Sequence, residues 1–248
     1  QKLLEMVRVI LHTAAALPIP FSLKMAGHAT ALNNAQSFRV SSGGEFINEI
    51  ITRLISAAPR KVMSFAYKLW HGGAKEIVRN HFPKPFQHIF NEDAVTIVNK
   101  EYEQPLKLDA NTADNKDKRA WVDHNQWEVT SERMSWKVIP VWSSCDGVKF
   151  KLYNSHHNMY LKLSYNHYGI VTDRKAWGTY EDYEDMHRFY LEPMVKDGIL
   201  VFFIISFEYG QALKLDEDMD SQGDRQVLGH NGSVYNEYER FRWAIAAW

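Results

Sequence analysis

The sequence has little cysteine and no long apolar run. Cys145 is the single cysteine among 248 residues, so no disulfide can form within the chain. No stretch of 18 consecutive apolar residues occurs, and a helix that spans a membrane is therefore not expected. Hydrophobic residues make up 45% and charged residues 24% of the chain, so a packed globular protein is expected.

The sequence also lacks the motifs of familiar catalytic and nucleotide-binding sites. It contains no P-loop, no G-x-G-x-x-G, no G-x-S-x-G and no H-E-x-x-H. The adjacent His156 and His157 have no third ligand at zinc spacing, and the acidic run from Asp216 lacks the Gly and Glu of a calcium loop. We therefore expect no enzyme, no cofactor and no metal site.

One pattern is present three times. Leu-Lys-Leu begins at residues 106, 161 and 213, in steps of 55 and 52 residues. Each copy lies between an apolar segment and an aromatic segment, so each repeat predicts four short strands. Twelve strands in three repeats fit a three-bladed propeller or a β-trefoil. Because propellers usually have four or more blades, the β-trefoil is favoured.

The middle residues of the three copies are Lys107, Lys162 and Lys214. Alternate residues of a strand point to opposite faces, which would place the leucines in the core and each lysine in water. A ring of lysines that binds a ligand is the less favoured alternative. We therefore predict a structural role for all three copies.

The first third of the chain has the apolar spacing of helices. One stripe runs from Phe46 to Ile55 before Pro59, a second from Val62 to Trp70, and shorter ones follow up to residue 90. Residues 1–90 contain 11 Lys+Arg and 4 Asp+Glu, whereas residues 91–248 contain 18 and 26. The two regions therefore carry net charges of +7 and −8. The sign of the charge and the type of apolar spacing both change near residue 90. The sequence predicts an α+β two-domain protein, with an all-helical N-terminal bundle at 1–91 and a β-trefoil domain of three four-strand repeats at 92–248.

The basic first region could attract anionic lipid head groups or glycans, or it could simply face solvent or the acidic trefoil. We expect no nucleic-acid partner. Apolar residues of this region are the candidates for contact with a lipid or fatty acid, because ligand sites occur between helices. They are Leu69, Trp70, Phe82 and Phe86.

Aromatic residues of the trefoil are candidates for stacking on a sugar. Tyr165, Tyr168 and Tyr180 lie in the least repeat-like stretch and are the glycan-binding candidates, whereas Trp121 and Trp177 recur at equivalent repeat positions and are expected in the core. The Gln-x-Trp signature of trefoil lectins is absent. Asn231-Gly232-Ser233 is a possible glycosylation site or simply an Asn-Gly turn.

Short segments spread over roughly residues 46–248 resemble the silkworm 30 kDa haemolymph lipoprotein family. They are Tyr67-Lys68-Leu69-Trp70, Lys75-Glu76-Ile77-Val78, Phe82-Pro83, Met134-Ser135-Trp136-Lys137, Val201-Phe202-Phe203-Ile204 and Gly229-His230-Asn231-Gly232. The resemblance implies a helical N-terminal domain, a β-trefoil and a secreted haemolymph protein stored in eggs. Lipid carriage, glycan binding and immune roles come with the family, and catalytic residues do not.

Two functions follow as expectations. The first is a secreted, extracellular storage and lipid-carrier lipoprotein without enzymatic activity. The alternative is a glycan-binding recognition protein of innate immunity, with polysaccharide as its partner. We expect a monomer in either case.

Overall fold

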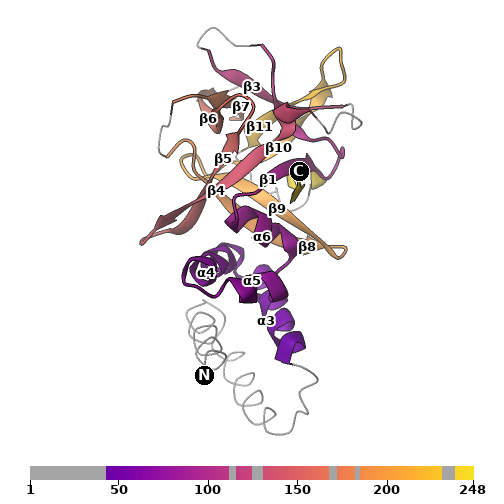
Figure 1. Cartoon of the computed structure of the whole chain (residues 1–248). Coiled ribbons are helices and arrows are strands. Elements are labelled where there is room, and N and C mark those ends of the chain that lie inside the picture. Colours follow the sequence, from indigo (N-terminus) through magenta and orange to yellow (C-terminus); the bar gives the residue numbers. More distant parts are fainter. Residues whose placement is uncertain (1–42, 112–115, 125–130, 168–171, 182–184, 231–237) are drawn as a thin grey trace.

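The computed structural model describes residues 43–111, 116–124, 131–167, 172–181, 185–230 and 238–248 (Figure 1). Four helices come first: α3 (Gly43–Ala57), α4 (Pro59–His71), α5 (Lys75–His81) and α6 (Lys84–Phe90). Proline lies in the first turn of α4 and α6, where its missing N–H costs no hydrogen bond. No described helix is long and apolar enough to cross a bilayer.

Twelve strands follow in three groups of four. The first group is β1 (Ala94–Asn99), β2 (Leu106–Leu108), β3 (Lys118–Val122) and β4 (Trp136–Ser143). The second is β5 (Gly147–Asn154), β6 (Met159–His167), β7 (Arg174–Thr179) and β8 (Phe189–Lys196). The third is β9 (Ile199–Ser206), β10 (Ala212–Met219), β11 (Arg225–His230) and β12 (Trp243–Ala247). The Leu-Lys-Leu copies fall in β2, β6 and β10, as the repeat predicted.

The strand pairing repeats three times around one axis. The outer strands of each group pair in the order β1–β4–β5–β8–β9–β12, and β12 returns to β1, so six strands close a barrel. The inner strands form the hairpins β2–β3, β6–β7 and β10–β11, whose second strands pair with one another. These three hairpins are called the cap. A barrel closed by such a cap is the arrangement of a β-trefoil.

Two glycines allow close packing inside the cap. A Cβ on Gly178 would overlap the Leu108 side chain, and a Cβ on Gly229 would overlap Leu163. Leu108 and Leu163 are fully buried, so neither can move aside into solvent. The hairpins can therefore approach each other only because these two positions carry no side chain.

The expected helical bundle is wrong, and with it the two-domain fold class. Of the four described helices, α3, α4 and α6 contact barrel strands at the end opposite the cap, and α5 packs on these three helices; together they are called the helical layer (Figure 1). The ring centroids of Phe86 and Phe202 are 6.3 Å apart, and those of Phe90 and Phe150 are 6.1 Å apart. Helix and barrel residues therefore share one hydrophobic core.

The helices do not form a separate bundle because they are short. With seven residues each, α5 and α6 are too short to be stable without tertiary packing. The apolar face of α6 is buried against the barrel strands β4 and β12, and α5 packs on α3, α4 and α6. The periodicity predicted the stripes correctly, but periodicity does not show which surface a stripe covers.

Candidate functional site: a polar pocket on the cap

The lysines of the Leu-Lys-Leu copies do not point into water. Each ammonium group forms an ion pair with an aspartate of a neighbouring hairpin, and each of these aspartates lies one residue before the second strand of its hairpin. The pairs are Lys107–Asp224 at 2.6 Å, Lys162–Asp117 at 2.9 Å and Lys214–Asp173 at 2.8 Å. The three hairpins are thus linked in a closed ring of ion pairs.

These ion pairs are largely buried, with side chains no more than 13% exposed. The expectation of solvated lysines was wrong because the polar face of each short strand is covered by the next hairpin. Burying two charges costs desolvation, which their attraction offsets only while both partners are present. The sequence does hold a signal for the ring, since an aspartate follows each lysine after ten or eleven residues.

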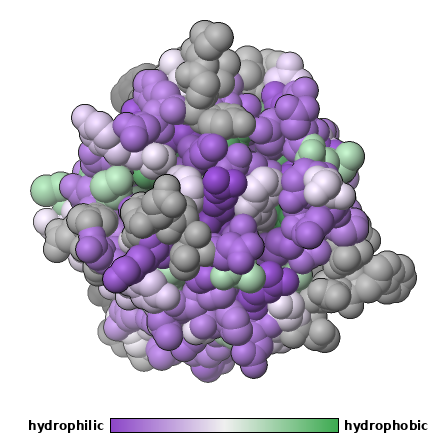
Figure 2. All heavy atoms as spheres, turned by 90° about the horizontal axis from the view of Figure 1, so that it is seen from above, coloured by the Kyte–Doolittle hydropathy of each residue, from purple (hydrophilic) through white to green (hydrophobic). Residues whose placement is uncertain are grey.

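A pocket of about 400 Å³ lies beside the first of these pairs, between the turn after β2 and the turn after β10. Its lining residues are Lys107, Asp109, Asn111, Arg119, Trp121, Arg133, Asp220, Ser221, Gln222 and Asp224. Three are cationic and three are carboxylates, so the lining is close to neutral. Figure 2 looks down on this end of the molecule, and most of the described surface there is hydrophilic. We call it the cap pocket.

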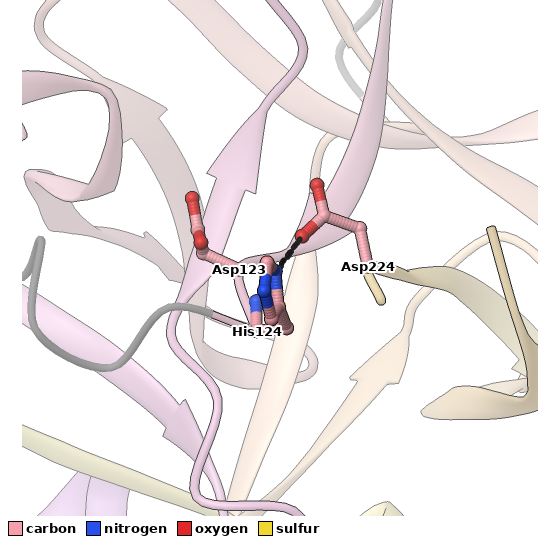
Figure 3. A group of neighbouring side chains, drawn as sticks. All are labelled: Asp123, His124 and Asp224. Carbon is pink, nitrogen blue, oxygen red and sulfur yellow. Dashed lines mark hydrogen bonds and ion pairs between the residues drawn. The ribbon is translucent and has the colours of Figure 1, made fainter. Parts of the chain in front are cut away.

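Three possible metal ligands lie close together in Figure 3, and one of them, Asp224, also lines the cap pocket. Asp123, His124 and Asp224 each offer a ligand atom, and these atoms lie within 4.8 Å of one another. Lys107 Nζ, however, is 2.7 Å from Asp123 Oδ2 and 2.6 Å from Asp224 Oδ2. The ammonium group already supplies the positive charge that both carboxylates need. The two carboxylates of this cluster are therefore explained by their ion pairs with Lys107, which connect two hairpins.

Trp121 is the aromatic residue of the cap pocket. Its indole Nε1 is buried and has no hydrogen-bond acceptor among the described residues. In the next repeat the equivalent Trp177 ring is covered by the Arg119 guanidinium, 5.7 Å from its centroid. At Trp121 the equivalent ladder neighbour is Gln226, an uncharged residue. Trp121 is therefore a half-buried ring with an unused N–H donor beside a polar space.

Such a pocket suits a neutral ligand rich in hydroxyl groups. Carboxylates accept hydrogen bonds, Arg119 and the amides donate them, and an aromatic ring offers an apolar face. The earlier assignment of Trp121 to the core missed this, because Trp121 and Trp177 occupy matching repeat positions but have different neighbours.

The expected glycan-binding tyrosines lie elsewhere. Tyr165 is 78% exposed near the end of β6, and Tyr180 is 56% exposed just after β7. Neither lines the cap pocket. Tyr168 and the possible glycosylation site Asn231 lie outside the described residues.

The four lipid-binding candidates lie together in the helical layer. Trp70, Phe82 and Phe86 are at most 5% exposed, and Leu69 is half-buried against them and the rest of the core. The rings of Phe82 and Phe86 are 5.2 Å apart. At the outer side, Lys75 Nζ lies 5.2 Å and Arg79 Cζ 5.5 Å from the centroid of Trp70. An apolar interior thus ends at a ring flanked by two cations.

The strand arrangement defines the chain as a β-trefoil protein with an added helical layer, and solved structures share this fold. The SDF2-like protein from Arabidopsis thaliana aligns with a TM-score of 0.52 and 11% identity, over 62% of this chain and 92% of its own. A Caenorhabditis elegans protein of unknown function aligns with a TM-score of 0.50 and 12% identity, over 63% and 94%. At these identities the likeness concerns the fold alone.

The sequence itself identifies the family. A family profile described as "Lepidopteran low molecular weight (30 kD) lipoprotein" matches residues 19–247, and the chain belongs to this family. The silkworm (Bombyx mori) "Low molecular mass lipoprotein PBMHP-6" is 36% identical over 90% of this chain and 85% of its own. "Microvitellogenin" of Manduca sexta is 36% identical over 88% and 86%. The resemblance noted from short segments is therefore confirmed.

Proposed function

We propose that the protein is a secreted storage and lipid-carrier protein of insect haemolymph, without enzymatic activity. The names of its relatives support this reading, since they include lipoproteins and a microvitellogenin. The observation that carries the proposal is the apolar interior of the helical layer, in which the buried Trp70 ring has the cations of Lys75 and Arg79 beside it.

A fatty acid has a carboxylate that suits the two cations and an acyl chain that suits the apolar interior. Its carboxylate would lie near the two cations, which are attracted to anions as well as to the indole face. Its acyl chain would replace part of the packing among Phe82, Phe86 and Leu69. Each buried apolar side chain contributes roughly 1.5–3 kcal/mol whether its neighbour is protein or ligand, so exchange between the two is possible at low cost.

The test is isothermal titration calorimetry, which measures the binding of oleate to lipid-free protein. Trp70→Ala should weaken binding at least about tenfold, the equivalent of the lower burial value. Trp142→Ala removes a tryptophan that is 38% exposed and should leave the oleate affinity unchanged. A folded Trp70→Ala protein with wild-type affinity would exclude Trp70 from the lipid site.

The cap pocket supports a second function, which is recognition of glycans in innate immunity. The supporting observation is the half-buried Trp121 ring in the lining of a polar pocket whose charges nearly cancel. A neutral glucan should bind there with little dependence on salt, since stacking and uncharged hydrogen bonds are not screened. Tyr165, Tyr168 and Tyr180 remain the candidates for a separate surface site. Loss of glucan binding in Tyr165→Ala but not in Trp121→Ala would favour that surface.

A further inference from the structure

The outer side of the helical layer carries a dense group of cations. Between residues 48 and 90 the chain has seven Lys+Arg and only two Asp+Glu. All seven cations are exposed: Arg53, Arg60, Lys61, Lys68, Lys75, Arg79 and Lys84. This side of the protein is therefore strongly positive, although the whole chain has a formal charge of −1.

The two carboxylates of this region neutralise only their nearest neighbours. Glu49 pairs with Arg53, and Glu76 pairs with Arg79, each within its own helix, while Arg60 pairs with Glu192 of strand β8. Lys68 and Lys75 have no carboxylate partner within the described part of the chain, and aromatic rings lie below their ammonium groups. Their charge is thus left available to a partner in solution.

A partly exposed tryptophan lies among these cations. Trp142, at the end of β4, stacks on Tyr67 of α4 with centroids 5.2 Å apart and planes within 5°. Lys68 Nζ lies 5.1 Å from the Trp142 centroid. Tryptophan with neighbouring lysine is the combination found at the polar boundary of lipid bilayers, because the indole is amphipathic and the ammonium contacts phosphate.

The charge of the remaining chain reinforces this orientation. Residues 91–248 carry a net charge of −8, and exposed acids such as Glu217, Asp218 and Asp220 lie on the β10–β11 hairpin of the cap. The cap is at the opposite end of the barrel from the helical layer (Figure 1). An anionic surface would therefore attract the helices and repel the cap.

We propose that the outer side of the helical layer docks the protein on anionic phospholipid surfaces. Lys61 and Lys68 are seven residues apart on α4, so they project from the same side of the helix, and Trp142 lies beside Lys68. Their ammonium groups contact lipid phosphates and carboxylates, and Trp142 lies at the head-group level. Docking does not require that the protein carry lipid, so it holds or fails independently of the function proposed above.

The test is co-sedimentation of the full chain with vesicles of phosphatidylcholine alone and of phosphatidylcholine with 30% phosphatidylserine. Wild type should bind the anionic vesicles, and raising the salt to 0.5 M should release it, because screening weakens contacts between exposed charges. Lys61→Gln with Lys68→Gln should weaken binding about 25-fold, at about fivefold for each cation. The matched control, Lys116→Gln with Lys137→Gln, removes two exposed cations, one in the β2–β3 hairpin of the cap and one on barrel strand β4, and should bind as wild type does.

Three results would overturn the proposal. One is equal binding to both kinds of vesicle, and another is wild-type binding by the Lys61→Gln/Lys68→Gln protein. The third is strong, salt-sensitive binding to heparin without binding to the anionic vesicles, which would assign the cations to a polyanionic glycan. Circular dichroism of each variant confirms that only surface charge has changed.

Discussion

Lys107 and Asp224 belong to different hairpins, 117 residues apart in the chain, and their charged groups are 2.6 Å apart in the buried cap. Lys107 also donates to Asp123 at 2.7 Å, so one ammonium joins the beginning of the trefoil to its last hairpin. Two further Lys–Asp pairs repeat this contact around the axis. The ring fixes the cap hairpins and forms one edge of the cap pocket.

We predict that Lys107→Met lowers the free energy of unfolding by about 3 kcal/mol, because it leaves two carboxylates buried without their counter-ion. Urea denaturation at neutral pH measures the change. Glu49→Gln breaks the exposed pair with Arg53 and should cost less than about 1 kcal/mol. Equal losses in the two proteins would contradict a structural role of the ring.

Stability should also depend on pH through His157. Burial of the ring, together with repulsion from nearby Lys118, His156 and Arg133, lowers the pKa of His157 to about 4 from the ordinary 6.5. The unfolded chain therefore takes up a proton at higher pH than the folded chain, and the free energy of unfolding falls as pH decreases from 6.5 to 4. The loss should be about 1–2 kcal/mol after allowance for solvent screening.

A substitution at this position tests the cause. His157 follows the end of β5 by three residues, as Tyr102 follows β1 and Tyr209 follows β9. We predict that His157→Tyr folds and removes most of the loss between pH 6.5 and 4, measured by urea denaturation at each pH. An unchanged slope would show that other groups cause the dependence.

Gly178→Ala should destabilise the protein by about 1–3 kcal/mol, because the new methyl group overlaps Leu108 in a fully packed interior. Thermal unfolding measures the effect. In a Leu108→Ala background the same substitution should cost less, since space has been created for the methyl group. Additive effects of the two substitutions would argue against direct overlap.

The two tryptophans at matching repeat positions should differ in ligand binding. Trp121→Ala should lower the affinity for neutral glucan about tenfold, the equivalent of one stacking contact. Trp177→Ala should leave the affinity near wild type, because Arg119 already covers that ring. A glucan array compares the two proteins directly, and equal losses would place the ligand outside the cap pocket.

Much of this fold could be predicted from local patterns. The predicted stripe that ends before Pro59 corresponds to α3, which ends at Ala57, and the stripe from Val62 to Trp70 lies within α4. The Leu-Lys-Leu period located β2, β6 and β10. These features depend on residues that are close together in the chain, so one sequence is enough to predict them.

Features that depend on distant residues could not be predicted. The periodicity did not show that the helices cover the barrel end, because an apolar stripe packs equally well on a helix or on a strand. The cap pocket combines residues of the first and third repeats, such as Trp121 and Gln222. Whether Trp121 is open or covered depends on one ladder neighbour, Gln226 in place of the Arg119 that covers Trp177.

Lipid carriage by this protein is tested most directly by the mass of the natively purified protein. Spectra are recorded under native and then denaturing conditions. We predict a native mass above that of the polypeptide, with the excess lost on denaturation and identified as fatty acid or other lipid. Equal masses under both conditions, in protein purified without detergent or lipid extraction, would contradict lipid carriage.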